Sequence, residues 1–281
     1  MKPKLIICGA AGRMGRRIVA LAVEEGLFEI AGAVEKAGHP DLGKDAGVLA
    51  GVTQLNVKVA DGFPGKADAD STPSTSSGQA SSPQVVIDFS LPEAADGSID
   101  YCAGNKAGLV LGTTGLSDSQ RKKIETASSK IPIVCATNMS VGMNTLFAVV
   151  GKVASMLGPD YDIEIVEQHH RFKKDAPSGS ALTLAENIAK ATDKDFPDCL
   201  THGRNGKDAL RDKGTIGMHA VRAGDIVGIH SVIFSTLGET VTLNHTAHSR
   251  DTFVRGALRA AGWLINKKPG LYSMADVLGL K

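Results

Sequence analysis

The segment that decides the fold of this chain reads Leu5-Ile6-Ile7-Cys8-Gly9-Ala10-Ala11-Gly12-Arg13-Met14-Gly15. Its first four residues form a short apolar run, which is typical of a strand buried on both faces of a parallel sheet. A turn with three glycines follows, and beyond it Ile18, Leu21 and Ala22 would share one face of a helix. The segment therefore predicts a buried strand, a tight turn and an amphipathic helix.

A second strand is expected over residues 29–34, and it ends at the acidic Glu35. This order of strand, glycine turn, helix, strand and acid is the layout of a dinucleotide-binding fingerprint. In that layout Gly9 and Gly12 permit the close approach of a pyrophosphate, while Gly15 lets the helix pack closely on the strand. Glu35 would bind the adenosine ribose hydroxyls. Because the spacing is GxxGxxG and not the commoner GxGxxG, a glycine turn without a ligand stays open as an alternative.

The choice between NADH and NADPH also stays open. Lys36 follows Glu35 directly, and Arg13 lies in the glycine turn. Basic side chains at these places would tolerate or attract a ribose phosphate, whereas the acid favours free hydroxyls.

Strands and helices continue to alternate up to residue 139. Further strands are expected over 85–89, 108–111 and 131–135, with helices over 91–107 and 119–129. This alternation predicts a Rossmann-like, doubly wound parallel α/β sheet. Ligands bind at the carboxyl ends of such strands, so the loops 9–14, 112–114 and 136–139 should converge on one cleft, although each loop alone can be only a connection. The Ser/Thr-rich residues 71–82 have little to bury and are expected to form a mobile surface loop.

The pattern changes after residue 140. A helix is expected over 144–157, followed by strands over 161–166, 214–220, 225–235 and 239–247, with a helix over 182–191 after the first strand. Neighbouring strands of this kind predict a second α+β domain with an open mixed sheet, whose uncovered face is available to a second subunit. A helix over 252–265 and the residues after it return the chain to the first domain. The expected domains are therefore 1–139 with 249–281, which bind the dinucleotide, and 140–248, for substrate binding and oligomerisation.

A second chemical segment follows the strand at 161–166 and reads Glu167-Gln168-His169-His170-Arg171-Phe172-Lys173-Lys174-Asp175-Ala176-Pro177-Ser178-Gly179-Ser180-Ala181. The Pro-Ser-Gly-Ser turn leaves backbone N–H groups at a helix start, which together with the helix dipole can bind a carboxylate. The histidines and the lysine place proton donors beside that position. A solvated basic loop capped by Ser178 is the alternative interpretation.

Residues 9–16, 112–115 and above all 167–181 resemble the 4-hydroxy-tetrahydrodipicolinate reductases, a family also called dihydrodipicolinate reductases. The likeness covers nearly the whole chain, and the histidine–lysine motif is its specific part. The resemblance implies reduction of a cyclic unsaturated dicarboxylate imine to tetrahydrodipicolinate by NADH or NADPH, in the diaminopimelate route to lysine. It also implies a homotetramer built through the second domain, and two domains that close on the substrate.

The resemblance also implies roles for particular residues. His169 would be the acid/base residue and Lys173 the proton donor, while His170 and the amides of Gly179 and Ser180 would hold substrate carboxylates. The implied cofactor-binding residues are Gly9, Ala10, Ala11, Gly12, Arg13, Met14, Glu35, Lys36, Gly112, Thr113, Thr114, Ala136, Thr137, Asn138, Met139, Arg250 and Phe253. The chain departs from the family pattern at Ser180, where threonine is usual, and in the segment 71–82.

Composition and residue spacing argue against several other classes of function. The 281 residues are 42% hydrophobic and 22% charged, with a net charge of +1, so there is no electrostatic reason to expect nucleic acid or an anionic membrane as a partner. The apolar run at 4–8 is too short for a signal peptide, which favours a cytoplasmic protein. Four dispersed cysteines lack zinc-site spacing, and adjacent His169 and His170 would point to opposite faces of a strand, so no metal is expected. A related amino-acid dehydrogenase and a non-catalytic dinucleotide sensor remain as alternatives.

Overall fold

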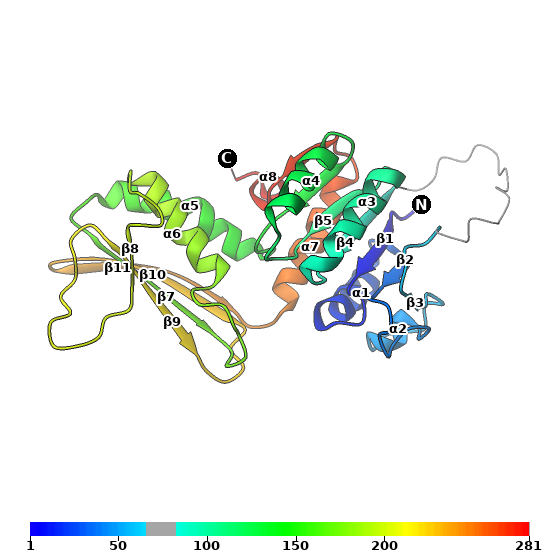
Figure 1. Ribbon diagram of the computed structural model, residues 1–281, viewed down its shortest axis with the longest axis horizontal. Helices are drawn as coiled ribbons and strands as arrows, with labels where there is room; N and C mark the ends of the chain where they lie inside the picture. The colour runs from blue at the N-terminus through cyan, green and yellow to red at the C-terminus, as the bar shows by residue number, and fades with distance from the viewer. Residues whose placement is uncertain (66–82, 281) are drawn as a thin grey trace. The chain divides into compact units, whose positions relative to one another are not determined.

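The computed structural model describes residues 1–65 and 83–280, and the chain divides into two compact units (Figure 1). Unit 1 comprises Met1–Met139 and Phe253–Val277, and unit 2 comprises Ser140–Thr252 together with the residues after Val277. The loop expected at 71–82 lies outside the described residues.

Within the described ranges, unit 1 contains a seven-stranded sheet in the order β12-β6-β5-β4-β1-β2-β3, in which every pairing is parallel. The strands are β1 Lys4–Cys8, β2 Glu29–Val34, β3 Val59–Ala60, β4 Gln84–Asp88, β5 Gly108–Leu111, β6 Pro132–Cys135 and β12 Gly270–Tyr272. This confirms the parallel α/β sheet, and β12 confirms that the end of the chain returns to it.

Helices pack on both faces of this sheet (Figure 1). They are α1 Arg13–Glu25, α2 Ala46–Leu49, α3 Ala95–Asn105, α4 Asp118–Ser128, α7 Asp251–Leu264 and α8 Met274–Leu278. The prediction of a single helix over residues 91–107 is wrong at its start and at its end. A 3-10 turn, η1 Pro92–Ala94, precedes α3, and Lys106 in the left-handed conformation ends it.

The core of unit 1 explains its uninterrupted apolar strands. Ile6, Val86, Leu109 and Ile133 lie on four neighbouring strands and are each 0% exposed. A strand covered by helices on both faces buries every side chain, so its sequence shows no alternation. Each such residue contributes about 1.5–3 kcal/mol of burial free energy.

Unit 2 contains, in the part of the chain that is described, a five-stranded mixed sheet in the order β11-β10-β7-β9-β8. Its strands are β7 Asp162–His169, β8 Leu200–His202, β9 Ile216–Arg222, β10 Gly228–Thr236 and β11 Glu239–Ala247. Sequence patterns missed β8 because three residues are too few to show a period. They also ended β7 at residue 166, but the strand continues to His169 because both neighbouring strands still pair with it. Because residues 167–169 are polar, the apolar alternation of the sequence did not indicate that the strand continues.

Helices α5 Val141–Leu157 and α6 Gly179–Ala191 cover one face of this sheet (Figure 1). Ile165, Val232 and Phe234 of the sheet and Leu184 of α6 are each 0% exposed between the two layers. Both helices begin three residues earlier than their apolar patterns indicate, because Ser140 and Ser178 cap their first turns. The sequence prediction of an α+β domain is confirmed.

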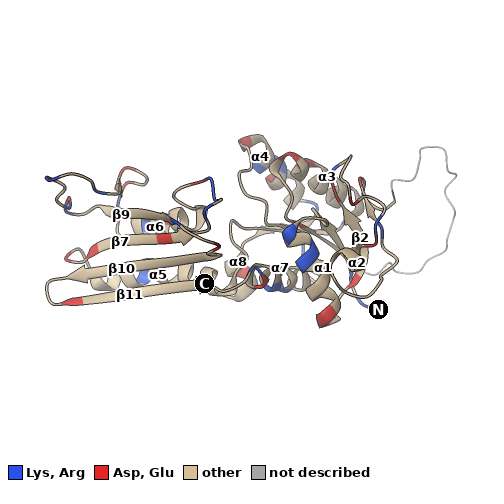
Figure 2. Cartoon of the chain, turned by 90° about the horizontal axis from the view of Figure 1, so that it is seen from below, with Lys and Arg blue, Asp and Glu red and all other residues tan. Residues whose placement is uncertain are grey.

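Charged residues of both signs are distributed over both units (Figure 2). In unit 2 the basic connection between β8 and β9 is held by Glu164 on the uncovered face of the sheet. Arg204 contacts this carboxylate with both terminal nitrogens, at 2.8 and 3.2 Å, and His219 lies 2.6 Å from it. Burial alone would disfavour the charge on Glu164, but the hydrogen bonds from Arg204 and His219 lower its pKa to about 2.

Candidate active site

The glycine turn after β1 is a tightly folded backbone structure. Gly9 adopts φ +73°, and the amides of Gly9 and Ala10 both donate to the carbonyl of Val34, at 2.9 and 3.0 Å. A Cβ atom placed on Gly15 would lie 2.1 Å from the carbonyl oxygen of Gly9. The turn therefore requires glycine at its first position for conformation and at Gly15 for helix packing.

Helix α1 starts without a side-chain cap. Its N-cap is Gly12, which has no side chain, whereas α4, α5 and α6 are capped by the hydroxyls of Ser117, Ser140 and Ser178. No acidic side chain lies in the first turn of α1. The positive end of the α1 dipole is therefore not neutralised by an acidic side chain of the first turn, and such a helix start is suited to binding a phosphate group.

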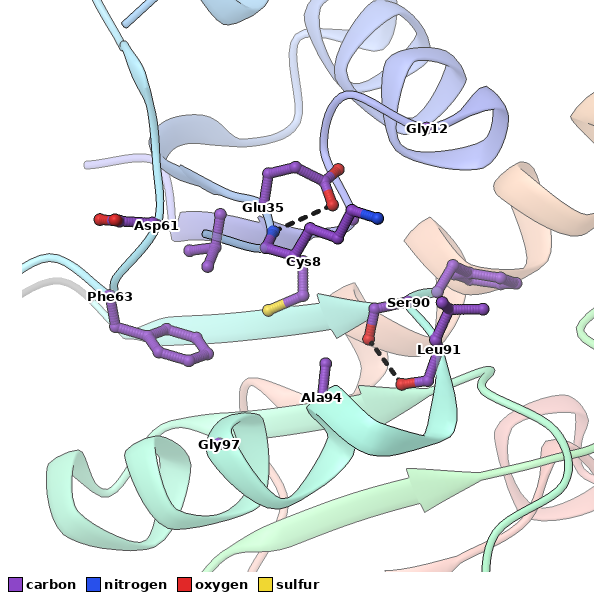
Figure 3. A pocket seen from close by; sticks show the side chains of 13 residues that line it. Cys8, Gly12, Glu35, Asp61, Phe63, Ser90, Leu91, Ala94 and Gly97 are labelled. Carbon is purple, nitrogen blue, oxygen red and sulfur yellow. Dashed lines mark hydrogen bonds between the residues drawn. The ribbon is translucent and has the colours of Figure 1, made fainter. Parts of the chain in front are cut away.

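A cavity of about 400 Å³ opens beside this turn (Figure 3). Phe63, Ala94 and Gly97 are among its lining residues, so an aromatic base would find apolar walls. The lining residues are Cys8, Gly9, Gly12, Val34, Glu35, Lys36, Asp61, Phe63, Phe89, Ser90, Leu91, Ala94 and Gly97. No sequence pattern indicated Asp61 or Phe63, because the residues from 38 to 65 show no clear periodicity.

Glu35 reaches from the end of β2 to the glycine turn. Its Oε2 accepts a hydrogen bond of 3.2 Å from the amide of Ala11, and its Oε1 accepts one of 3.0 Å from the amide of Lys36 (Figure 3). Acid and turn, 24 residues apart in sequence, are thus brought together as the fingerprint layout predicts.

Asp88 joins the loops that follow β4 and β5. This carboxylate is 0% exposed and accepts hydrogen bonds from the hydroxyls of Ser90, Ser98 and Thr113, at 2.5, 2.5 and 3.2 Å. The Thr113 hydroxyl therefore faces inward, and the part of residues 112–114 in cofactor binding stays a prediction. No motif signalled Asp88, which reads as the end of an apolar strand.

The loop after β6 lies next to the loop after β5. The amide of Ala136 donates to the carbonyl of Leu111 at 3.2 Å, which joins the 136–139 loop to the Gly112 end of β5. Met139 is buried, at 1% exposed. Arg250 and Phe253 belong to different units, and their part in cofactor binding stays a prediction.

In unit 2, His169 is the last residue of β7 and is held by Glu167 on the same strand. Residues two apart on a strand share a face, and Nδ1 of His169 lies 2.6 Å from Oε2 of Glu167. Both oxygens of this carboxylate also accept a hydrogen bond of 2.7 Å from Arg222, at the end of β9. Arg222 was not identified from the sequence, since it lies far from the motif and follows an ordinary strand pattern.

The loop after β7 returns Lys173 toward the same network. Its Nζ lies 2.8 Å from Asp175, whose backbone carbonyl accepts a hydrogen bond of 2.6 Å from Arg222. His170 is half-buried, with its ring centroid 6.3 Å from that of Phe172. The two proton donors expected from the sequence, His169 and Lys173, are therefore linked to one arginine.

The start of α6 completes this group. The hydroxyl of Ser178 accepts from the amide of Ala181 at 3.2 Å and lies 3.1 Å from Nε2 of His230 on β10. A Cβ atom on Gly179 would meet no atom within 4 Å, so there is open space above the first turn. Ser180 is 9% exposed, and it keeps the hydroxyl and amide expected at this position.

Burial and neighbouring charges determine the protonation states of the network. Burial raises the pKa of Glu167, but the hydrogen bonds from His169 and Arg222 outweigh it and hold the pKa at about 2. An ionised carboxylate only accepts hydrogen bonds, so Nδ1 of His169 carries a hydrogen and Nε2 is left to exchange a proton. Burial, followed by the nearby His169, lowers the pKa of His230 to about 3. His230 is therefore neutral at physiological pH.

Two further properties concern metal ions and membranes. Among the described residues, no group of three or more His, Cys, Asp or Glu side chains is placed to bind a metal ion. None of the helices found in residues 1–65 and 83–280 combines the length and apolar character that a membrane span needs.

A parallel sheet with an uncapped glycine turn and a cavity at its carboxyl edge, combined with a histidine–lysine site on a second sheet, defines a dinucleotide-dependent oxidoreductase. Comparison with known proteins gives the family. Residues 3–139 match the model described as "Dihydrodipicolinate reductase, N-terminus", and residues 142–278 match "Dihydrodipicolinate reductase, C-terminus". The chain belongs to the dihydrodipicolinate reductase family.

Curated relatives are similar to the chain over almost their whole length. The 4-hydroxy-tetrahydrodipicolinate reductases of Geotalea daltonii and Geobacter sulfurreducens are 44% and 43% identical to the chain over 278 residues, which is 99% of this chain and 99% of each relative. The chain is therefore a reductase, an oxidoreductase of lysine biosynthesis.

Solved structures support the fold alone. A dipicolinate-bound dihydrodipicolinate reductase from Paenisporosarcina sp. TG-14 is similar with a TM-score of 0.65 and 21% identity, covering 98% of this chain and 99% of that chain. A myo-inositol dehydrogenase from Corynebacterium glutamicum has a TM-score of 0.58 and 12% identity, covering 100% of this chain and 94% of that one.

Proposed function

We infer that the enzyme reduces 4-hydroxy-tetrahydrodipicolinate, through dihydrodipicolinate, to tetrahydrodipicolinate in the diaminopimelate pathway. The observation that carries this proposal is the grouping of His169, Lys173 and the start of α6 around the Glu167 carboxylate. A proton donor beside an anion-binding helix start suits a dicarboxylate that must gain a hydride and a proton. Bound NADH or NADPH supplies the hydride.

The residues of unit 1 fit such a dinucleotide. The turn of residues 9–14 would hold the pyrophosphate at the start of α1, where the amides of Arg13 and Met14 lie in the first helical turn. A side chain at Gly9, Gly12 or Gly15 would strain or obstruct this turn. Glu35 and Lys36 would hold the adenosine ribose, and Phe63 would offer an apolar surface to the adenine. The loops 112–114 and 136–139, together with Arg250 and Phe253, contact the nicotinamide half.

The residues of unit 2 hold the substrate and move its proton. The amides of Gly179 and Ser180, with His170, bind the carboxylates. Lys173 attracts the dianion and donates a proton, and Nε2 of His169 acts as the acid/base atom. Because Glu167 occupies Nδ1, the imidazole exchanges protons through one defined nitrogen.

Cofactor use follows from the charges around the ribose. Lys36 would meet a 2′-phosphate, while Glu35 and Asp61 line the same cavity with negative charge. We propose that both cofactors are used and that NADH is preferred, since two carboxylates oppose one ammonium group.

The enzyme assembles as a homotetramer through the uncovered face of the unit 2 sheet. Val166, Ile229 and Ile233 are half-buried on that face, where helices are lacking within the described chain. Light scattering should give four times the chain mass of 29.2 kDa, and a monomer in solution would contradict this assembly. All four cysteines are free, which supports a reducing compartment such as the cytoplasm.

The decisive experiment follows nicotinamide absorbance when purified enzyme meets substrate made freshly from pyruvate and aspartate semialdehyde by the preceding synthase. We expect rapid oxidation of NADH and a lower kcat/KM with NADPH. Cofactor binding without oxidation of either cofactor would contradict the proposed reaction. A higher kcat/KM with NADPH would contradict only the preference.

A further inference from the structure

Arg222 lies outside the segment 167–181, but it hydrogen-bonds two residues of that segment, Glu167 and Asp175. Its two terminal nitrogens lie 2.7 Å from the two oxygens of Glu167, and one of them also donates to the carbonyl of Asp175 at 2.6 Å. The side chain of Glu167 is 1% exposed and that of Arg222 is 19% exposed. The contact is therefore a two-point ion pair shielded from water, which is geometrically specific.

Glu167 in turn contacts both His169 and Ser178, the residue that caps α6. Oε2 accepts from Nδ1 of His169 at 2.6 Å, and Oε1 accepts from the amide of Ser178 at 3.0 Å. The first contact sets the tautomer and ring orientation of the histidine. The second fixes the residue that caps α6, next to the amides that bind carboxylate.

Arg222 adds a third constraint through the loop. Asp175, whose carbonyl it binds, also holds Nζ of Lys173 at 2.8 Å. The arginine on β9 is thus joined to the lysine by one intermediate residue and to the histidine by another. A rigid network of this kind keeps donor groups in productive geometry.

We propose that Arg222 and Glu167 form a positioning pair that fixes the Nδ1–H tautomer of His169 and holds His169, Lys173 and the start of α6 together. Neither residue touches the substrate in this role. The inference rests on the proposed function, and it assigns to Arg222 a contribution that the histidine–lysine motif does not contain.

Several charged and polar side chains surround His169. Glu167 faces it from β7, Arg222 from β9 and neutral His230 from β10, with Lys173 and Asp175 in the following loop. Replacing Glu167 by Gln removes the carboxylate oxygen that fixes the hydrogen on Nδ1 of His169.

Three variants test the pair. In Glu167→Gln the amide oxygen can still accept from Ser178, but the amide nitrogen cannot accept from Nδ1 of His169. Because Arg222→Met leaves a buried carboxylate without its partner and can fail to fold, the double variant Glu167→Gln/Arg222→Met provides a neutral pair. We expect kcat to fall about 10- to 100-fold in the single Gln variant and in the double variant, with KM changed less than about threefold.

The matched control is Arg204→Met, which removes the equivalent two-point contact with Glu164 on the uncovered face of the same sheet. It should keep the kcat of the wild type. Nitrogen-15 histidine spectra should show Nδ1–H at His169 in the wild type and its loss in Glu167→Gln. This readout needs no turnover, so it separates failure of the pair from failure of the proposed reaction. Folded Gln and double variants with wild-type kcat and wild-type tautomer would overturn the positioning role.

Discussion

The hydroxyl of Ser178, at the start of α6, lies 3.1 Å from Nε2 of His230, which belongs to β10 of the adjoining sheet. His230 is 3% exposed, and its Nδ1 has no hydrogen-bond partner among the described residues. The residue that caps the proposed carboxylate-binding helix is thus supported by a buried histidine whose pKa is lowered to about 3. This contact makes the stability of the site sensitive to acid.

Stability should fall as pH falls below about 6.5, the ordinary pKa of histidine. The unfolded chain binds a proton at His230 between pH 6.5 and about 3, whereas the folded chain does not, because burial and His169 lower the folded pKa to about 3. The expected loss at about pH 4.5 is roughly 2–3 kcal/mol. Urea unfolding of the wild type and His230→Gln at neutral and acidic pH measures it, and the variant should lose less. Equal losses in both proteins would contradict a neutral buried His230.

Replacing Gly15 by Ala should weaken both folding and cofactor binding. The added Cβ would lie 2.1 Å from the Gly9 carbonyl oxygen and would push α1 away from the turn. We expect a loss of about 1–3 kcal/mol in stability. Fluorescence titration with NADH should show a raised Kd.

Gly104→Ala in α3 is the matched control, because a Cβ there meets no atom within 4 Å. This variant should gain up to about 1 kcal/mol from helix propensity and bind NADH normally. If Gly15→Ala also binds NADH with wild-type affinity, close packing at the turn is not needed.

His169→Gln should lower kcat by roughly two to four orders of magnitude, with a smaller change in KM, because it removes the acid/base nitrogen. His219→Gln is its control, since His219 also lies 2.6 Å from a glutamate but on the other face of the sheet. Steady-state kinetics on both variants make the comparison. Turnover in His169→Gln equal to that of the control would remove His169 from the chemistry.

Lys173→Ala should raise KM and lower kcat together, because the lysine both attracts the dianion and donates a proton. Lys174→Ala, at the exposed neighbouring position, should change neither constant by more than about twofold. A Lys173→Ala enzyme with wild-type kinetics would show that Asp175 holds the ammonium group for another purpose.

Much of the fold can be predicted from local sequence. Apolar runs such as residues 5–8 and 108–111 identify buried parallel strands, because both faces of the sheet are covered and the whole run is apolar. The glycine turn and Glu35 could be placed together, since strand, helix and strand have fixed geometries. The short strand β8 and the start of α3 could not be predicted, because pairing and packing decide them and local periodicity does not.

The sequence by itself determined the family and predicted two domains and the roles of His169 and Lys173, because these inferences depend on residue types at short spacing. Only the tertiary structure decided which side chains hold the two predicted sites in place. Arg222 and His230 in unit 2, and Asp88 in unit 1, contact partners that are 10 to 55 residues away in sequence. Their roles depend on strand register and burial, which arise from long-range pairing that no local pattern records.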